Sequence, residues 1–153
     1  MIHFEPITED TFYIAKEMIN SNKNYNVMEN GIPTRTDDEI RKEFYDPKTK
    51  SLFIKADDTY IGIVNYLPIN PKDDTTWIGL FLIHEDYHGY GYGSMAYAAL
   101  EEMFYQGGIP KLRLGVLEKN EGAKRFWERN GYLFYTSSKM NGTDVDCYEK
   151  CFR

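Results

Sequence analysis

The sequence predicts a mixed α/β (α+β) fold in a single domain that spans residues 1–153. The first observation is a run of apolar, β-forming residues at 77–83, followed by alternating glycines and by helical spacing from Ser94 to Gln106. A second β-rich run at 111–116 comes after that helix. Because a strand–helix–strand crossover joins parallel strands, we expect 77–83 and 111–116 to run parallel.

The second observation is a pair of hairpins on either side of this unit. Runs at 51–56 and 60–67 are separated by a short polar turn, and runs at 133–138 and 145–152 flank Asn141-Gly142, a strong turn signal. Residues 1–6 resemble a short first strand. We therefore expect a mixed, mostly antiparallel sheet of six to seven strands with about four helices.

The N-terminal third contains two helix starts. Thr8 precedes a first helix whose apolar spacing continues to Ile19, and Thr36-Asp37-Asp38-Glu39 forms a capping box that begins a second. The polar segment 25–35 between them contains Gly31 and Pro33 and is predicted to be a loop. Such a loop is either a moving flap over a substrate or a plain surface connection.

The glycine-rich turn after 77–83 has two readings. Gly89, Gly91 and Gly93 lack a Cβ, so several main-chain N–H groups can point into one concavity at the positive end of a helix and bind a phosphate or pyrophosphate. Alternatively, the segment is only a tight strand-to-helix turn. Two common phosphate motifs do not fit, because Ser94 replaces the third glycine of GxGxxG and no lysine follows Gly93 as in a P-loop.

A third pattern fits better. The stretch His88-Gly89-Tyr90-Gly91-Tyr92-Gly93 resembles the pyrophosphate-binding motif of the GCN5-related N-acetyltransferase (GNAT) superfamily, which is Arg or Gln, two residues, Gly, one residue, then Gly or Ala. The glycines match, whereas His88 stands where the family usually has Arg or Gln. Histidine can still donate a hydrogen bond, but its charge depends on pH. We expect the main-chain cradle and leave the side-chain contact at position 88 open.

A second stretch strengthens the resemblance. Residues 117–132, read alone, form an amphipathic helix with Asn120 as its N-cap and Asn130-Gly131 as its stop. In register with the first stretch, they are similar to the family's next motif, in which Asn, Ala, an aromatic pair and Gly-Tyr recur at these intervals. The two motifs have the expected order and separation, and together they cover residues 77–132.

The resemblance implies a central parallel strand pair that is splayed to hold acetyl-CoA as co-substrate. The pantetheine arm would pair with main-chain groups at Leu82 and Ile83, and the pyrophosphate would lie on the loop 88–94. An acceptor amine would attack the thioester directly while main-chain N–H groups polarise its carbonyl. The cofactor-binding residues implied are Leu82, Ile83, His88, Gly89, Tyr90, Gly91, Tyr92, Gly93, Ser94, Asn120 and Trp127.

The catalytic residues are poorly marked. Many relatives have a tyrosine in the second helix that protonates the leaving thiolate and a glutamate on the central strand as base, but Trp127 stands at the tyrosine position and 77–83 has no carboxylate. Asn120 is a weak catalytic candidate, and capping the helix is its alternative role. Lys124 and Arg125 can reach cofactor phosphates or simply be exposed helix charge. Either another tyrosine (Tyr66, Tyr97 or Tyr135) or solvent would supply the proton, and the nearby His84, Glu85 and Glu118 are either candidate bases or solvated surface groups.

Composition limits the partners. A net charge of −6 argues against nucleic acid and favours a cationic partner. Acidic residues at 37–39, 57–58 and 73–74 either gather at a substrate mouth or lie in solvated loops. No apolar run reaches membrane-spanning length, and no signal peptide precedes the first strand. Cys147 and Cys151 are too far apart for a disulfide within one strand, so we expect reduced thiols packed in the core of a cytoplasmic protein, with no metal site.

Two functions from different classes follow. The first is an acetyl-CoA-dependent N-acetyltransferase that moves the acetyl group to a primary amine of a small molecule or peptide. The alternative is a CoA-binding sensory or regulatory domain with little catalysis, and a weaker third option is a domain that binds another nucleotide. We expect a monomer or homodimer, and the acceptor is left open.

Overall fold

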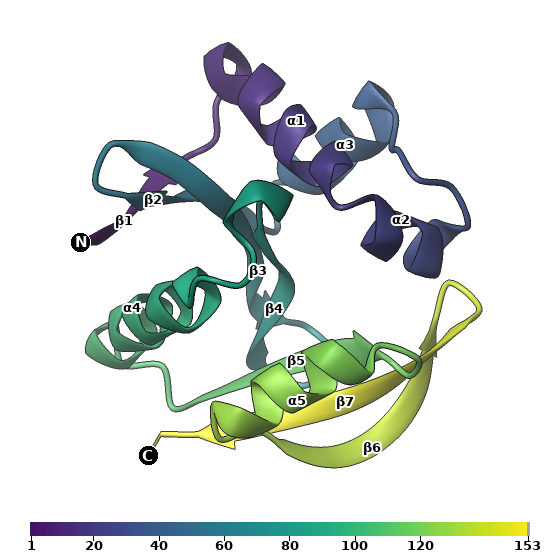
Figure 1. The fold of residues 1–153 in the computed structure, drawn as a ribbon. Coiled ribbons are helices and arrows are strands. Elements are labelled where there is room, and N and C mark those ends of the chain that lie inside the picture. Colours follow the sequence, from purple (N-terminus) through teal and green to yellow (C-terminus); the bar gives the residue numbers. More distant parts are fainter. Residues whose placement is uncertain (153) are drawn as a thin grey trace.

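A seven-stranded sheet runs through the computed structural model, which describes residues 1–152 (Figure 1). The strand order is β1-β2-β3-β4-β5-β7-β6, and each neighbouring pair is antiparallel except β4 and β5, which are parallel. The predicted mixed sheet and its parallel pair are therefore confirmed. The strands are β1 (Ile2–Pro6), β2 (Lys50–Ala56), β3 (Thr59–Asn70), β4 (Thr75–Ile83), β5 (Lys111–Leu117), β6 (Leu133–Met140) and β7 (Thr143–Cys151).

Helices cover both faces of the sheet. The first three lie together on one side, and the last two pack on the other (Figure 1). Short 3₁₀ turns at Glu9–Thr11 and Glu85–Tyr87 precede α1 and α4. The α-helices among the described residues are α1 (Phe12–Ser21), α2 (Lys23–Asn30), α3 (Asp37–Phe44), α4 (Tyr92–Gln106) and α5 (Glu121–Arg129).

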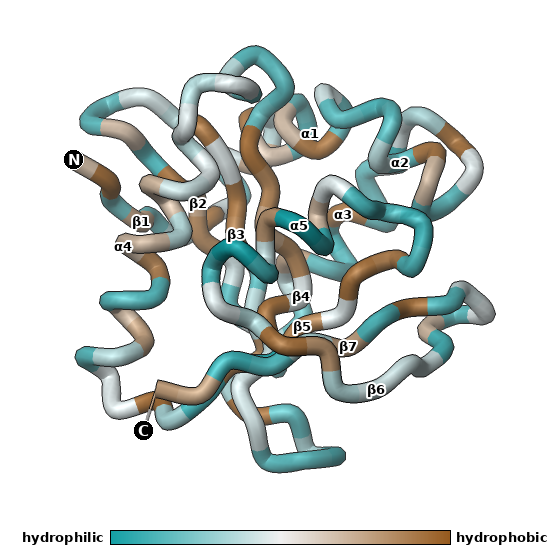
Figure 2. Tube along the Cα trace, turned by 60° about the horizontal axis from the view of Figure 1, so that its bottom comes forward, coloured by the Kyte–Doolittle hydropathy of each residue, from teal (hydrophilic) through white to brown (hydrophobic). Residues whose placement is uncertain are grey.

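The central strands divide the core into two layers. Figure 2 shows the hydrophobic centre of β3, β4 and β5 surrounded by hydrophilic connections. Because side chains alternate along a strand, Leu82 of β4 packs against α1 and α3, whereas Phe81 and Ile83 pack in the cluster formed with α4 and α5. The strand β4 is therefore buried on both faces, and its main chain is the part left to interact at its edge.

The parallel pair is short. Thr76–Ile78 of β4 pair with Leu112–Leu114 of β5, and the pairing ends there although both strands continue. The register between β3 and β4 shifts next to Asn65, which leaves Gly79 as an extra residue in β4. A Cβ at Gly79 would lie 3.1 Å from the Asn65 side-chain oxygen. The bulge therefore coincides with the point where β4 separates from β5.

Charged side chains tie the paired end of these strands together. The Arg113 guanidinium donates to Asp73 at 2.9 Å and to Glu149 at 2.8 Å, and Trp77 Nε1 also donates to Asp73 at 2.8 Å. Burial opposes ionisation of both carboxyls, but these hydrogen bonds outweigh it and hold the pKa of Asp73 and of Glu149 below their ordinary values. The parallel pair of β4 and β5 is thus stabilised by these charged groups at one end, whereas the two strands are separated at the other end.

The segment 25–35 corrects one prediction. Residues 23–30 form the helix α2, so the predicted loop is wrong there and the described chain contains five α-helices. Asparagine has low helix propensity, but here buried Asn26 donates through Nδ2 to Ile19 O at 3.0 Å and to Pro33 O at 2.9 Å. These tertiary hydrogen bonds override local preference, and Gly31 at φ 77° ends the helix.

Two smaller differences have simple causes. Strand β3 continues through Pro68 to Asn70, and the proline sits where the ladder with β4 is already irregular, so its missing N–H breaks no regular pairing. Cys147 is buried as expected, but Cys151, the last residue of β7, is exposed, so core packing is wrong for that thiol. No helix within residues 1–152 is long and apolar enough to cross a membrane.

Candidate active site

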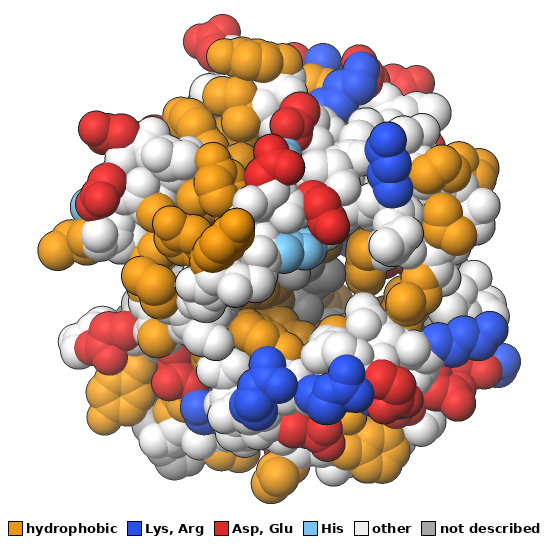
Figure 3. Space-filling model, in the orientation of Figure 1, with side chains coloured by type: hydrophobic (Ala, Val, Ile, Leu, Met, Phe, Trp, Pro, Cys, Tyr) orange, Lys and Arg blue, Asp and Glu red, His pale blue; other side chains and the backbone are white. Residues whose placement is uncertain are grey.

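The separated strands border a cleft of about 1110 Å³. Ile78–Ile83 of β4 form one wall and Leu114–Leu117 of β5 the other. The glycine-rich loop, α5, α2 and the turn between β6 and β7 complete the lining. Figure 3 shows the hollow near the centre of the molecule, with basic side chains along the rim formed by α5.

The N–H and C=O groups of β4 point alternately toward β3 and toward the side of β5. A Cβ at Gly62 of β3 would collide with the carbonyl oxygen of Leu82, and the His84 N–H donates to Ile61 O of β3. Because successive residues of a strand point their N–H and C=O groups to opposite sides, those of Phe81 and Ile83 point away from β3 and toward the cleft. Of the two residues expected to pair with the pantetheine arm, Ile83 turns its main-chain groups away from β3, whereas those of Leu82 face β3 and Phe81 takes its place.

The glycines of the loop have different roles. Gly89 at φ 85° and Gly91 at φ 82° adopt the left-handed conformation that favours glycine, and Gly91 is the N-cap of α4. At Gly93 a Cβ would lie 3.4 Å from the Phe126 ring, so this glycine allows α4 and α5 to approach closely. No side chain caps α4, which leaves its first N–H groups and positive dipole end available to an anion.

His88 is held against the end of β4. Its Nε2 lies 2.6 Å from Ile83 O and must carry the proton that it donates, while its Nδ1 lies 3.2 Å from Glu85. Asn22 Nδ2 donates to the same carbonyl at 3.2 Å. The imidazole therefore braces the cleft-facing carbonyl of β4 and links it to the glycine loop.

Most predicted cofactor residues line the cleft. The exceptions are Tyr90, which is 73% exposed, and Ser94. Asn120 lines it and also caps α5, since its side-chain oxygen accepts from Ala123 N at 3.1 Å. Lys124 does not line it, because its ammonium is paired with Asp146 at 2.8 Å. Arg125 is exposed and lies outside the lining as well.

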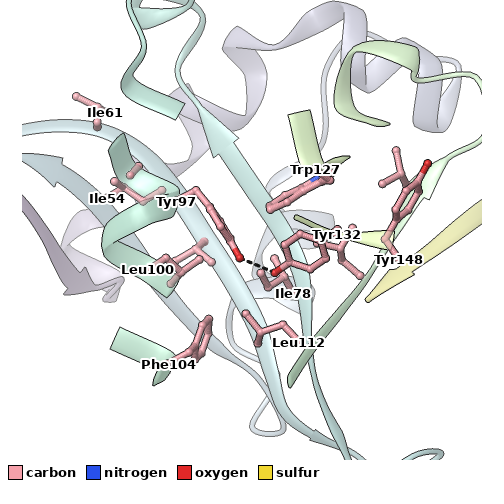
Figure 4. Packing of buried hydrophobic residues seen from close by; sticks show 14 residues of the cluster. Ile54, Ile61, Ile78, Tyr97, Leu100, Phe104, Leu112, Trp127, Tyr132 and Tyr148 are labelled. Atoms are coloured by element: carbon pink, nitrogen blue, oxygen red, sulfur yellow. Dashed lines mark hydrogen bonds between the residues drawn. The ribbon is translucent and has the colours of Figure 1, made fainter. Parts of the chain in front are cut away.

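Trp127 lines the cleft and belongs to an aromatic cluster that continues into the core (Figure 4). It is only 7% exposed, and beside it the buried hydroxyls of Tyr97 and Tyr132 lie 2.8 Å apart. Burial raises the pKa of both phenols, and Tyr97 also donates to Glu101 at 3.1 Å. Tyr97 is therefore a core residue and does not reach the cleft.

The other predicted acids and bases differ in whether they line the cleft. Tyr66 packs on Phe104 and Tyr135 on Arg113, so neither lines the cleft. The tyrosines that do are Tyr25, Tyr87 and Tyr92.

Among the nearby polar groups, Glu85 lines the cleft, whereas Glu118 does not. His84 lies beside a separate cavity of about 560 Å³, where its Nε2 is 2.6 Å from Glu17. The acidic stretches 37–39, 57–58 and 73–74 do not line the cleft either. Instead, Asp37 pairs with Lys16, Asp57 with the N-terminal amine and Asp73 with Arg113.

Sequence reasoning missed the residues of the α2 wall. Tyr25 and Glu29 on α2, with Arg35 and Glu43, line the side of the cleft away from α4 and α5. The one available signal was the i,i+4 spacing of Tyr25 and Glu29, which places them on the same side of a helix. That signal has no force in a segment read as a loop.

Comparison with known proteins agrees with this architecture. The model described as "Acetyltransferase (GNAT) family" matches residues 15–132. The chain belongs to this family. An uncharacterized N-acetyltransferase, YycN, of Bacillus subtilis (strain 168) is 31% identical over an alignment of 81 residues that covers 43% of this chain and 52% of the relative. The chain thus matches about half the length of that curated relative.

Solved structures share the whole fold. An acetyltransferase from Thermus thermophilus superimposes with a TM-score of 0.80 at 20% identity, over 99% of this chain and 97% of that one. Spermidine N-acetyltransferase from Vibrio cholerae, in complex with CoA and spermine, gives 0.74 at 19% identity, over 98% and 95%. At these identities the likeness establishes the GNAT fold and leaves the substrate to be argued from the site.

Proposed function

We propose that this protein is an acetyl-CoA-dependent N-acetyltransferase that transfers the acetyl group directly to a primary amine. The observation that carries the proposal is the early end of the β4–β5 pairing at Ile78 and Leu114, beside an uncapped, glycine-started helix. A pantetheine arm can replace the missing strand partner, and the loop can take the diphosphate. Solved GNAT structures with CoA support this assignment of the cofactor.

The residues divide into three groups under this proposal. The N–H groups at the start of α4, including those of Tyr92 and Gly93, would hold the diphosphate. The cleft-facing main chain of Phe81 and Ile83 would hold the pantetheine arm and offer an N–H to the carbonyl that the amine attacks. Asn120 and Trp127 would border the thiol end from α5. Acetyl-CoA supplies an activated acyl group, so the protein needs no acyl-enzyme.

Few residues of the site are suited to the proton transfers that the reaction requires. The attacking amine must be neutral and the leaving thiolate must gain a proton, yet β4 carries no carboxylate and the tyrosine position is Trp127. A positioned general acid or base contributes roughly 10²–10⁴-fold to a rate. We therefore expect acetyl transfer with a turnover number in the low part of the range for enzymes.

The two free cysteines favour a cytoplasmic location for the protein.

Two measurements test the proposal together. Saturating acetyl-CoA should raise the melting temperature, whereas ATP and NAD should not, because a ligand that binds only the native state stabilises it. With acetyl-CoA present, a panel of primary amines assayed for CoA release should identify at least one acceptor.

The outcomes separate the two functional classes. Stabilisation by acetyl-CoA with no CoA release from any amine would favour the sensory or regulatory CoA-binding domain. An unchanged melting temperature would contradict both, and stabilisation by ATP or NAD would favour a different nucleotide.

A further inference from the structure

The α2 wall of the cleft carries an oriented carboxylate. The Tyr25 hydroxyl donates to one oxygen of Glu29 at 2.7 Å, and the Asn30 amide donates to the other at 3.3 Å. Both donors are neutral. Burial, followed by the nearby Glu29 charge, raises the pKa of Tyr25, so the phenol stays protonated and keeps donating. The Glu29 carboxylate is thus fixed in direction at the edge of the cleft.

The neighbouring charges do not neutralise Glu29. Arg35 donates to Glu43 at 2.8 Å, and these two side chains are only 15% and 28% exposed, so they form a close pair of their own. Arg35 lies near enough to Glu29 to feel its field, but the three groups together still carry one surplus negative charge. The other acidic and basic side chains in the lining are Glu85, His88 and Arg129, and the lining also contains the neutral phenols of Tyr87 and Tyr92.

The position of α2 relative to the sheet identifies which ligand it faces. The glycine loop and α5 lie on one face of the sheet, whereas α2 joins α1 and α3 on the other (Figure 1). The gap between β4 and β5 connects the two faces, and Met140, Asn141 and Thr143 of the β6–β7 turn also border it. A group that enters from the α2 side meets the gap from the face opposite the cofactor loop.

We propose that Glu29 is the acceptor-recognition residue and that the acceptor is an aliphatic diamine or polyamine. The inference rests on the proposed acetyl transfer. The reacting nitrogen must be neutral when its new C–N bond forms and the C–S bond breaks, with the proton lost by nitrogen balanced by the one gained by sulfur. It therefore cannot be the cation that offsets Glu29. A second ammonium on the same molecule can offset the charge of Glu29, because Tyr25 and Asn30 hold the Glu29 carboxylate toward it.

The test compares Glu29→Gln with the wild type, using 1,4-diaminobutane and 1-aminobutane. The binding of each amine is measured by calorimetry on the protein saturated with CoA, and CoA release is measured separately with acetyl-CoA. Loss of a charge-assisted hydrogen bond should weaken diamine binding about tenfold or more and leave the monoamine unchanged. Glu102→Gln, the same chemical change on the exposed surface of α4, should alter neither amine.

Each other result is informative. Equal losses for both amines, or no loss for either, would overturn the role of Glu29. A tripeptide amide with uncharged side chains serves as the competing acceptor. If it binds more tightly than the diamine, and if this binding depends on Glu29, the polyamine assignment is overturned. Glu29→Asp keeps the charge but shortens its reach and should fall between wild type and Glu29→Gln, which excludes a folding artefact. Absence of CoA release with every amine would contradict acetyl transfer, whereas diamine binding that ignores Glu29 would contradict only the present inference.

Discussion

At the scale of single residues, His88 shows how a departure from a family motif can change a role. Its imidazole donates to Ile83 O at the end of β4, where Asn22 donates as well, and its other nitrogen faces Glu85. From this geometry we propose that His88 is a positioning residue for the cleft-facing main chain. A direct contact with the diphosphate would require the ring to leave a 2.6 Å hydrogen bond.

We expect His88→Ala to weaken acetyl-CoA binding by roughly 2- to 12-fold, the range for losing one net hydrogen bond. His88→Gln, which retains an amide donor, should recover part of the loss. The decisive comparison is acetyl-pantetheine, which lacks the diphosphate. If His88 acts through Ile83, both ligands should lose affinity by a similar factor. A loss confined to the ligand with the diphosphate would instead show that the ring contacts the phosphates.

At the scale of elements, α2 depends on one buried side chain. Asn26 is 2% exposed and its amide donates to two carbonyls, Ile19 O on α1 and Pro33 O beyond the helix. These bonds fix the helix that carries Tyr25 and Glu29. The glycine loop and α5 pack instead in the cluster on the other face of the sheet, and Asn22, the N-cap of α2, also donates to Ile83 O near that loop.

Asn26→Ala should therefore weaken the binding of the acceptor and leave the binding of the cofactor nearly unchanged. Leaving buried carbonyls without donors costs about 1–3 kcal/mol, and amides of α2 should exchange faster with solvent. The acceptor KM should rise while the dissociation constant of acetyl-CoA stays within twofold or so of wild type. Lys23→Ala, an exposed change on the same helix, serves as the control. A parallel fall in cofactor affinity would show that α2 is not an independent acceptor wall.

At the scale of the whole molecule, the sheet is fastened at one end of the parallel pair and open at the other. The fastening is Arg113 with Asp73 and Glu149, whose side chains are 21–25% exposed. The open end is the cleft. Because the pKa values of both carboxyls are depressed in the folded state, acid should remove the stability that this cluster contributes to the paired end.

Arg113→Met should lower the free energy of unfolding by about 1.5–3 kcal/mol near pH 7, the range for hydrogen bonds to charged groups. A depressed carboxyl pKa stabilises the fold above the unfolded value and stops doing so as the pH falls through the folded value. The gap between wild type and variant should therefore shrink as the pH falls below the ordinary values of 4.5 and 3.8. Melting curves across that range, with Lys139→Met in an exposed ion pair as control, measure it. A pH-independent gap would contradict an electrostatic fastening.

Local patterns predicted most of this architecture because each pattern carried its own signal. The alternating runs, the Asn141-Gly142 turn and the capping box at Thr36 act within a few residues, and the structure contains the corresponding elements. Helix α2 escaped prediction because Asn26 favours the helix only through hydrogen bonds to residues outside it. The candidate acceptor wall escaped with it. The register of β4, which turns Phe81 rather than Leu82 toward the cleft, depends on its pairing with β3.

The most direct measurement of the central claim is a crystal structure of the protein with acetyl-CoA. We expect the diphosphate within hydrogen-bonding distance of the main-chain N–H groups at 89–93, and the pantetheine arm between β4 and β5 beyond Ile78. A cofactor bound elsewhere, or β4 and β5 paired along their full length, would contradict the account.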